Sequence, residues 1–101
     1  MFETVSADEV RNRRLAGMTS AERAAYDEAF VEATARLEIA QMVYDARQAA
    51  GVTQTELAQA AGTRQNVISA IETGAKVPGA ITLAKIAHAL GCSLRIEPIA
   101  A

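Results

Sequence analysis

Apolar positions recur every three or four residues over most of this chain, a spacing typical of amphipathic helices. The longest stripe follows Thr19 and Ser20, either of which can cap a helix, and no proline or glycine interrupts it before Gly51. One face carries Tyr26, Phe30, Ala33, Leu37, Ala40 and Tyr44, and a neighbouring face carries Ile39, Val43, Ala46 and Ala50. A helix of about 30 residues is roughly 45 Å long, which is long for a domain this small. The pattern therefore predicts one long helix whose two halves have different roles.

The part of this helix from about Leu37 onward is expected to be the first helix of a compact bundle. The part before it projects beyond that bundle and cannot bury its apolar stripe alone. A short helix, capped by Ser6 and stopped by Gly17, is expected to precede it. Two alternatives follow for the projecting part. Either the short helix folds back over the stripe, or the stripe is a surface for a partner or a second subunit, formed by Tyr26, Phe30 and Leu37.

Three shorter helices are expected after the turn at Gly51. The first covers residues 54–61, because Thr53 and Glu56 have the spacing of a capping box. Gly62 then stands where the chain must turn sharply, a role suited to a residue that tolerates positive φ.

The next helix is expected to begin at Thr63 or Arg64 and to end near Thr73, and the last to run over about 80–90. Helical spacing predicts which residues form the inner faces of the three helices. They are Leu57, Ala61, Val67, Ile68, Ile71, Ile81, Leu83, Ala84, Ile86, Ala87 and Leu90.

The end of the chain changes character after Gly91. Leu94 and Ile96 alternate with Arg95 and Glu97, which predicts a short strand. A lone strand is marginal, so the simplest partner is the same strand of a second subunit. The tail is therefore predicted to be a dimerisation strand.

Composition suits this helical picture but complicates the choice of partner. The chain has 101 residues, about one domain, and its alanine-rich apolar content with only 4% aromatic residues favours closely packed helices. The formal net charge is -2, with five basic and seven acidic side chains in residues 1–36 and five of each in residues 37–101. Nucleic-acid-binding domains are usually basic. Binding to nucleic acid would therefore depend on locally placed donors and on two copies acting together.

Few residues point to other chemistry. Cys92 is the only cysteine, so a disulfide within the chain is impossible, and it is expected to be a small buried hydrophobic residue. His88 is the only histidine and has no nucleophile arrangement around it, so no catalytic site, metal or cofactor is expected. No apolar run is long enough for a membrane span, and the first residues do not resemble a signal peptide. The expected location is the cytoplasm, without membrane contact.

The segment from Gln54 to Thr73, QTELAQAAGTRQNVISAIET, combines a helix, a tight turn on Gly62 and a second helix. Ala58 falls where the two helices cross, and its small side chain lets them approach. In these features residues 37–90 resemble the Cro/CI-type (Xre) family of helix-turn-helix proteins. The resemblance implies an all-α fold, a five-helix DNA-binding bundle of the phage-repressor type. The helix after the turn would lie in the major groove of double-stranded DNA.

The resemblance also implies contacts for individual residues, carried over by position. Those expected to face the bases are Gln65, Asn66, Ser69 and Ala70, and the candidate phosphate contacts are Gln54, Arg64 and Lys76. Glutamine and asparagine can each form two hydrogen bonds with adenine, whereas Ala70 could offer only a methyl contact, for instance to thymine. Phosphate contacts position a protein without specifying sequence. The alternative is that these exposed amides have no function.

A structural ion pair is implied as well. The family often joins an arginine of the first bundle helix to a glutamate that closes the helix in the groove. Arg47 and Glu72 hold those positions in this chain. The pair is expected to tie that helix to its scaffold, with a net stabilisation that desolvation keeps small.

A narrower resemblance covers the helical extension, AYDEAFVEATARLEIAQMVYDARQAAGVTQTELA, and the segment after HALGCSL. Both look like HigA-type antitoxins of bacterial toxin–antitoxin pairs. This implies a homodimer that binds palindromic DNA, represses its own operon and neutralises a cognate RNA-cleaving toxin. The acidic N-terminal arm would suit a basic nuclease. The alternative is a stand-alone transcriptional regulator with the same DNA chemistry and no toxin.

These expectations divide the chain into three parts. Residues 1–36 form a helical extension that binds a partner, and residues 37–91 form the DNA-binding domain. Residues 92–101 form the C-terminal strand used in dimerisation.

Overall fold

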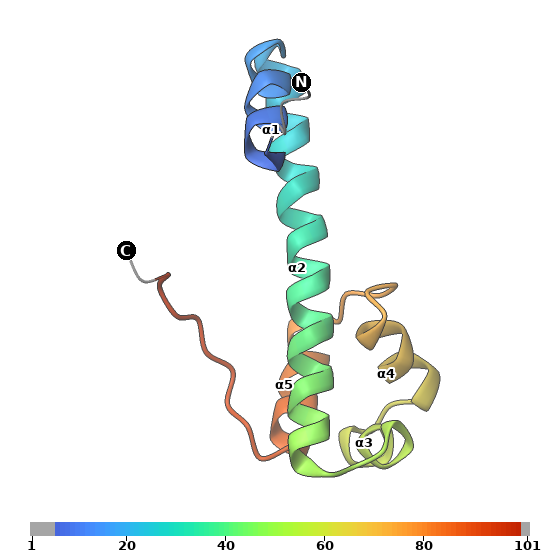
Figure 1. Ribbon diagram of the computed structural model, residues 1–101. Helices are drawn as coiled ribbons and strands as arrows, with labels where there is room; N and C mark the ends of the chain where they lie inside the picture. The colour runs from blue at the N-terminus through green and yellow to red at the C-terminus, as the bar shows by residue number, and fades with distance from the viewer. Residues whose placement is uncertain (1–5, 100–101) are drawn as a thin grey trace, which may run out of the picture. The chain divides into compact units, whose positions relative to one another are not determined.

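The computed structural model describes residues 6–99, and all regular secondary structure within them is helical (Figure 1). The helices are α1 (Ala7–Ala16), α2 (Ser20–Ala50), α3 (Gln54–Ala61), α4 (Gln65–Glu72) and α5 (Ala80–Ala89). The all-helical fold predicted from the sequence is therefore confirmed. The chain divides into two compact units, one up to residue 33 and one from residue 34, and α2 contributes residues to both.

Side-chain caps begin the first two helices. The hydroxyl of Ser6 accepts a hydrogen bond from the N–H of Glu9 at 3.1 Å, and α1 follows. The hydroxyl of Thr19 accepts one from the N–H of Glu22 at 3.1 Å, at the start of α2. Each cap satisfies an N–H that the helix itself leaves unpaired.

Within the first unit, α1 contacts α2 through an arginine and an aromatic ring. The guanidinium carbon of Arg11 lies 5.2 Å from the centroid of the Phe30 ring, and the rings of Tyr26 and Phe30 stack at 6.5 Å. None of the residues of α1 is buried, and Phe30 remains 47% exposed. The short helix therefore folds back onto the apolar stripe but covers it only in part.

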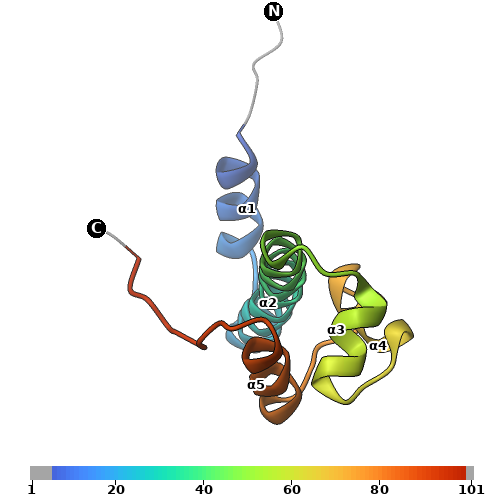
Figure 2. The same cartoon turned by 90° about the horizontal axis from the view of Figure 1, so that it is seen from below.

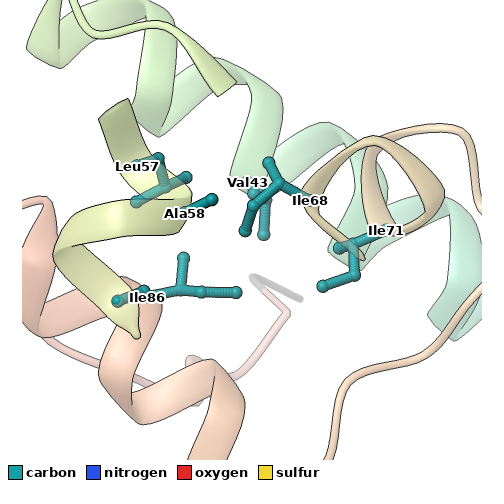
Figure 3. Packing of buried hydrophobic residues seen from close by; sticks show 7 residues of the cluster. Val43, Leu57, Ala58, Ile68, Ile71 and Ile86 are labelled. Carbon is teal, nitrogen blue, oxygen red and sulfur yellow. The ribbon is translucent and has the colours of Figure 1, made fainter. Parts of the chain in front are cut away.

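The core of the second unit lies between α3, α4, α5 and the C-terminal half of α2. Its buried side chains point toward a common centre in Figure 3. They are Val43, Leu57, Ala58, Ala61, Ile68, Ile71 and Ile86. Ala58 is only 2% exposed, and its small side chain lets α3 pack closely against its neighbours. The inner positions of α3 and α4 therefore agree with their sequence pattern.

The turn between α3 and α4 is made by Gly62. Its φ of 69° and ψ of 33° lie in the left-handed region, where a residue with a Cβ is strained. A Cβ built there would meet nothing within 4 Å, so backbone conformation and not crowding favours glycine. The N–H of Thr63 then bonds the carbonyl of Ala58 at 2.9 Å, which closes the end of α3. At the start of α3, Thr53 and Glu56 form the reciprocal capping box.

The orientation of α5 differs from expectation. Ile81 is 72% exposed and Ala84 is also exposed, although both were predicted to be inside. The inner face is formed by Leu83, Ile86, Ala87 and Leu90. This helix is apolar almost all round, so periodicity alone could not identify which face is buried.

The tail also differs from expectation. The strand predicted at Leu94 and Ile96 is not formed, and residues 92–99 leave α5 without regular secondary structure (Figure 2). A strand needs a neighbour for its backbone hydrogen bonds, and residues 6–99 offer none. Cys92, predicted to be buried, is an exposed free thiol at the start of this segment.

Candidate nucleic-acid interface

One face of α4 carries four residues that could contact a ligand. Gln65 and Asn66, in its first turn, are exposed, and Ser69 and Ala70, one turn later, are half-buried. The opposite face holds the fully buried isoleucines of the core. The amphipathic pattern of α4 therefore directs its small polar side chains outward on one surface.

Gln54, the first residue of α3, holds the side chain of Gln65. Nε2 of Gln65 donates a hydrogen bond to Oε1 of Gln54 at 2.7 Å. Nε2 of Gln54 in turn donates to Oε1 of Glu72, in the last turn of α4, at 3.3 Å. Gln65 is thus oriented before any ligand arrives, which lowers the entropy cost of ordering it on binding.

Arg47 and Glu72 form an ion pair with two hydrogen bonds. Nε of Arg47 lies 2.7 Å from Oε2 of Glu72, and Nη2 lies 2.8 Å from Oε1. The two side chains are only 10% and 4% exposed. Nη1 of Arg47 also donates to the carbonyl of Val52 at 3.0 Å. One guanidinium therefore joins α2, the turn before α3 and the end of α4.

This environment shifts both pKa values in the direction that keeps the pair charged. Burial raises the pKa of Glu72, but the hydrogen bonds from Arg47 and Gln54 and the positive charge of Arg47 outweigh it. The pKa of Glu72 is therefore lower than its ordinary value of 4.5. The hydrogen bond to Glu72 raises the pKa of Arg47, against the opposite effect of burial.

Two exposed cations flank α4. Arg64 immediately precedes the helix as its N-cap residue, and Lys76 lies in the loop that follows it. The backbone N–H of Lys76 bonds the carbonyl of Ala70 at 3.1 Å. Nη1 of Arg36 donates to the carbonyl of Gly74 at 3.4 Å, which ties the same loop to α2. Lys76 therefore belongs to a loop that hydrogen bonds hold to α4 and α2, and Arg64 belongs to the N-cap of α4.

The sequence did not indicate two of these contacts. The bond between Gln54 and Gln65 joins residues 11 apart, and only the turn at Gly62 brings their side chains together. The contact of Arg36 with the loop spans 38 residues. For the bond between Gln54 and Gln65, the only signal in the sequence was that each of α3 and α4 begins with a glutamine.

The remaining predicted functional residues belong to other elements. Tyr26 and Phe30 are in the first unit, and Leu37 is 69% exposed on α2 in the second. Leu94 and Ile96 are exposed in the tail.

Within residues 6–99, no three histidine, cysteine, aspartate or glutamate side chains are placed to hold a metal ion. No helix in this part of the chain is both long and apolar enough to cross a membrane.

Comparison with known proteins gave one finding. A family model described as helix-turn-helix matches residues 43–96, just over half of the chain. Neither a search of curated proteins nor a search of solved structures found a match. The matched segment contains α3, the turn, α4 and α5, and so includes the whole candidate interface except Arg36.

The ion pair predicts how stability depends on pH. Because the pKa of Glu72 is lower in the folded chain, its contribution to stability is present above about pH 4.5. It is lost as the pH falls through the folded-state value. Replacing both partners, Arg47→Met with Glu72→Met, removes this contribution without leaving a buried charge unpaired. We expect the wild type to lose more free energy of unfolding than the double variant between about pH 7 and about pH 3, measured by urea denaturation.

The single variant Arg47→Met is the control for the buried charge. It should lower the free energy of unfolding by about 3–5 kcal/mol near pH 7, because it leaves the Glu72 carboxylate buried and unpaired. Equal acid sensitivity of the wild type and the double variant would remove Glu72 as the source of the pH dependence.

Proposed function

The chain belongs to the helix-turn-helix family, and on that basis we propose that it is a transcriptional regulator that reads DNA sequence with the first turn of α4. The observation that carries this proposal is the pair of exposed amides, Gln65 and Asn66, at the start of a helix whose other face is fully buried. A helix of this kind fits the major groove, where its N-terminal residues reach the base edges.

The chemistry of the two amides fits base recognition. A carboxamide offers a donor and an acceptor side by side, which matches the acceptor N7 and the donor N6 of adenine. Ser69 can exchange a single hydrogen bond with a base, and the methyl group of Ala70 can contact that of thymine.

Phosphate contacts would come from the surrounding cations and from α3. Arg64 and Lys76 are exposed on either side of α4. Gln54 stands in the first turn of α3, where free N–H groups favour an anion, and its Nε2 has a second hydrogen besides the one directed at Glu72. These contacts would position the protein without specifying bases.

Replacing Gln65 and Asn66 together with alanine tests base reading. We expect sequence preference to disappear, because each well-formed amide–adenine pair contributes about 1–3 kcal/mol of discrimination. Selection from randomised duplexes, followed by mobility shift on the selected site, measures this loss. Gln59→Ala removes an exposed amide from α3 and should leave the preference unchanged. An unaltered preference in the double variant would exclude these two residues as the base readers.

The regulator is proposed to act as a homodimer on a palindrome. Residues 37–101 carry equal numbers of acidic and basic side chains, so one copy has little general attraction for phosphates. An apolar hollow on the second unit is lined by Met42, Leu83, Leu90 and Leu94, and Ile96 beyond it is fully exposed. A second copy would cover this surface and pair the tails as strands. Two copies of α4 about 34 Å apart would then read successive major grooves.

The variant Leu94→Glu tests the dimer. It should weaken self-association by about tenfold or more, because burial of a leucine contributes roughly 1.5–3 kcal/mol. Sedimentation equilibrium measures the effect, and removal of residues 92–101 should reproduce it. Ile81→Glu changes an exposed isoleucine on the other face of α5 and serves as the control. A truncated chain that associates as tightly as the wild type would rule out the tail.

A finer proposal is that the regulator is also an antitoxin. The first unit adds an acidic arm, since residues 1–33 hold seven acidic and four basic side chains. The stacked Tyr26 and Phe30 leave apolar surface exposed there, and Leu37 is exposed on α2. The acidic first unit with its exposed aromatic surface fits a basic RNA-cleaving toxin, by charge and by burial of aromatic area, and Leu37 is proposed as a further contact. The alternative is a stand-alone regulator, in which these residues meet no toxin.

Co-expression with an RNA-cleaving protein encoded beside this chain distinguishes the antitoxin from the stand-alone regulator. The antitoxin proposal expects a stable complex and restored growth, both lost in Tyr26→Ala with Phe30→Ala. The variant Gln65→Ala with Asn66→Ala should still neutralise the toxin, because its changes lie in α4. Intact DNA binding with no complex and no rescue would leave the stand-alone regulator.

A further inference from the structure

A chain of hydrogen bonds leads from the buried ion pair to the surface of α4. Oε1 of Glu72 accepts from Nη2 of Arg47 at 2.8 Å and from Nε2 of Gln54 at 3.3 Å. Oε1 of Gln54 then accepts from Nε2 of Gln65 at 2.7 Å. Exposure increases along this series of hydrogen bonds. The Glu72 side chain is 4% exposed, Gln54 is half-buried, and Gln65, at the outer end, is exposed.

The charge of Glu72 determines the direction of every bond in this chain. An ionised carboxylate can only accept hydrogen bonds, so Gln54 must turn its NH2 group toward Glu72. The carbonyl oxygen of Gln54 then faces Gln65, which must donate a hydrogen bond from its own NH2 group. Reversing any one amide would place two acceptors or two donors against each other at hydrogen-bond distance.

One donor and one acceptor of Gln65 remain for a ligand. The NH2 group has a second hydrogen, and Oε1 is unused by Gln54. Adenine presents an acceptor and a donor in the major groove, which this pair matches. Guanine presents two acceptors, N7 and O6, which would need both hydrogens of the NH2 group.

We propose that Glu72 is a positioning residue for base recognition, which acts through Gln54 to make Gln65 select adenine over guanine. The inference rests on the proposed reading of DNA by α4. It assigns to the ion pair a role in specificity beyond holding the helix in place.

The variant Glu72→Gln changes the polarity with little change of shape. A neutral amide no longer fixes the direction of these hydrogen bonds, because each of its two orientations leaves one Arg47 donor facing the NH2 group. In the orientation that presents the NH2 group to Gln54, the carboxamides of Gln54 and Gln65 turn over, and Gln65 offers both hydrogens outward to the two acceptors of guanine. Gln54→Leu removes the middle residue of the hydrogen-bond series and leaves the Arg47–Glu72 pair intact. It therefore tests the role of the series in base selection in a protein whose ion pair is undisturbed.

The experiment compares dissociation constants of full-length variants on two duplexes. A site is first selected from randomised DNA, and the position read by Gln65 is the one at which Gln65→Ala loses its preference. The duplexes carry adenine or guanine at that position. We expect the wild type to favour adenine by roughly 5–150-fold, and this ratio to fall about tenfold or more in both Glu72→Gln and Gln54→Leu. Gln54→Leu also tests whether a lost phosphate contact weakens both duplexes equally, which would leave the ratio unchanged.

Glu38→Gln makes the same chemical change at an exposed position of α2 and should keep the wild-type ratio.

The inference is overturned if Gln54→Leu keeps the wild-type ratio of the two dissociation constants. It is also overturned if Glu72→Gln keeps that ratio and urea denaturation shows that this variant is folded. If Glu72→Gln does not fold, Gln54→Leu decides alone. A wild type that selects a site but reads guanine through Gln65 overturns this inference and leaves the proposed function standing. A wild type that selects no site overturns both.

Discussion

The Arg47–Glu72 pair constrains the position of α4 through two buried hydrogen bonds between charged groups. Both side chains are almost completely buried, and the carboxylate is held by two short bonds from one guanidinium. The same guanidinium holds the carbonyl of Val52, so a shift of α4 would also disturb the turn that starts α3. Because desolvating two charges is costly, such a pair is tolerated only where its geometry is kept.

Apolar packing alone would not give this precision. The core around Ile68 and Ile71 is small and contains several alanines, and dispersion and the hydrophobic effect have little directional preference. A helix of eight residues is only about 12 Å long and could rotate or slide on such a surface. Glu72 anchors one end of α4 and Gln65 the other, and both anchors meet at Gln54. The directional contacts therefore supply what the core lacks.

Most of the fold could be predicted because its determinants are local. The cap at Thr53 and the turn at Gly62 depend on residues within one helical turn, and the buried face of α4 follows from its spacing. The buried face of α5 could not be predicted, because apolar residues surround that helix and only its neighbours select among them. The Gln54–Gln65 bond likewise depends on how the turn places two helices. The strand predicted in the tail is not formed, because a strand needs a hydrogen-bonding neighbour and residues 6–99 do not provide one.

The second unit carries six basic and five acidic side chains, and this small net charge does not oppose the proposed function. Glu72 is one of its five acidic groups and is neutralised internally by Arg47, while Glu97 lies 3.6 Å from Arg95 in the tail. Arg64 and Lys76 stand beside α4, so the charge that a phosphate would meet is local. Weak general attraction lowers affinity for all sequences alike, whereas base contacts raise it for one. Under the proposed function, selectivity would come from the amides at the start of α4, and that of Gln65 is oriented through Gln54 by the buried carboxylate of Glu72.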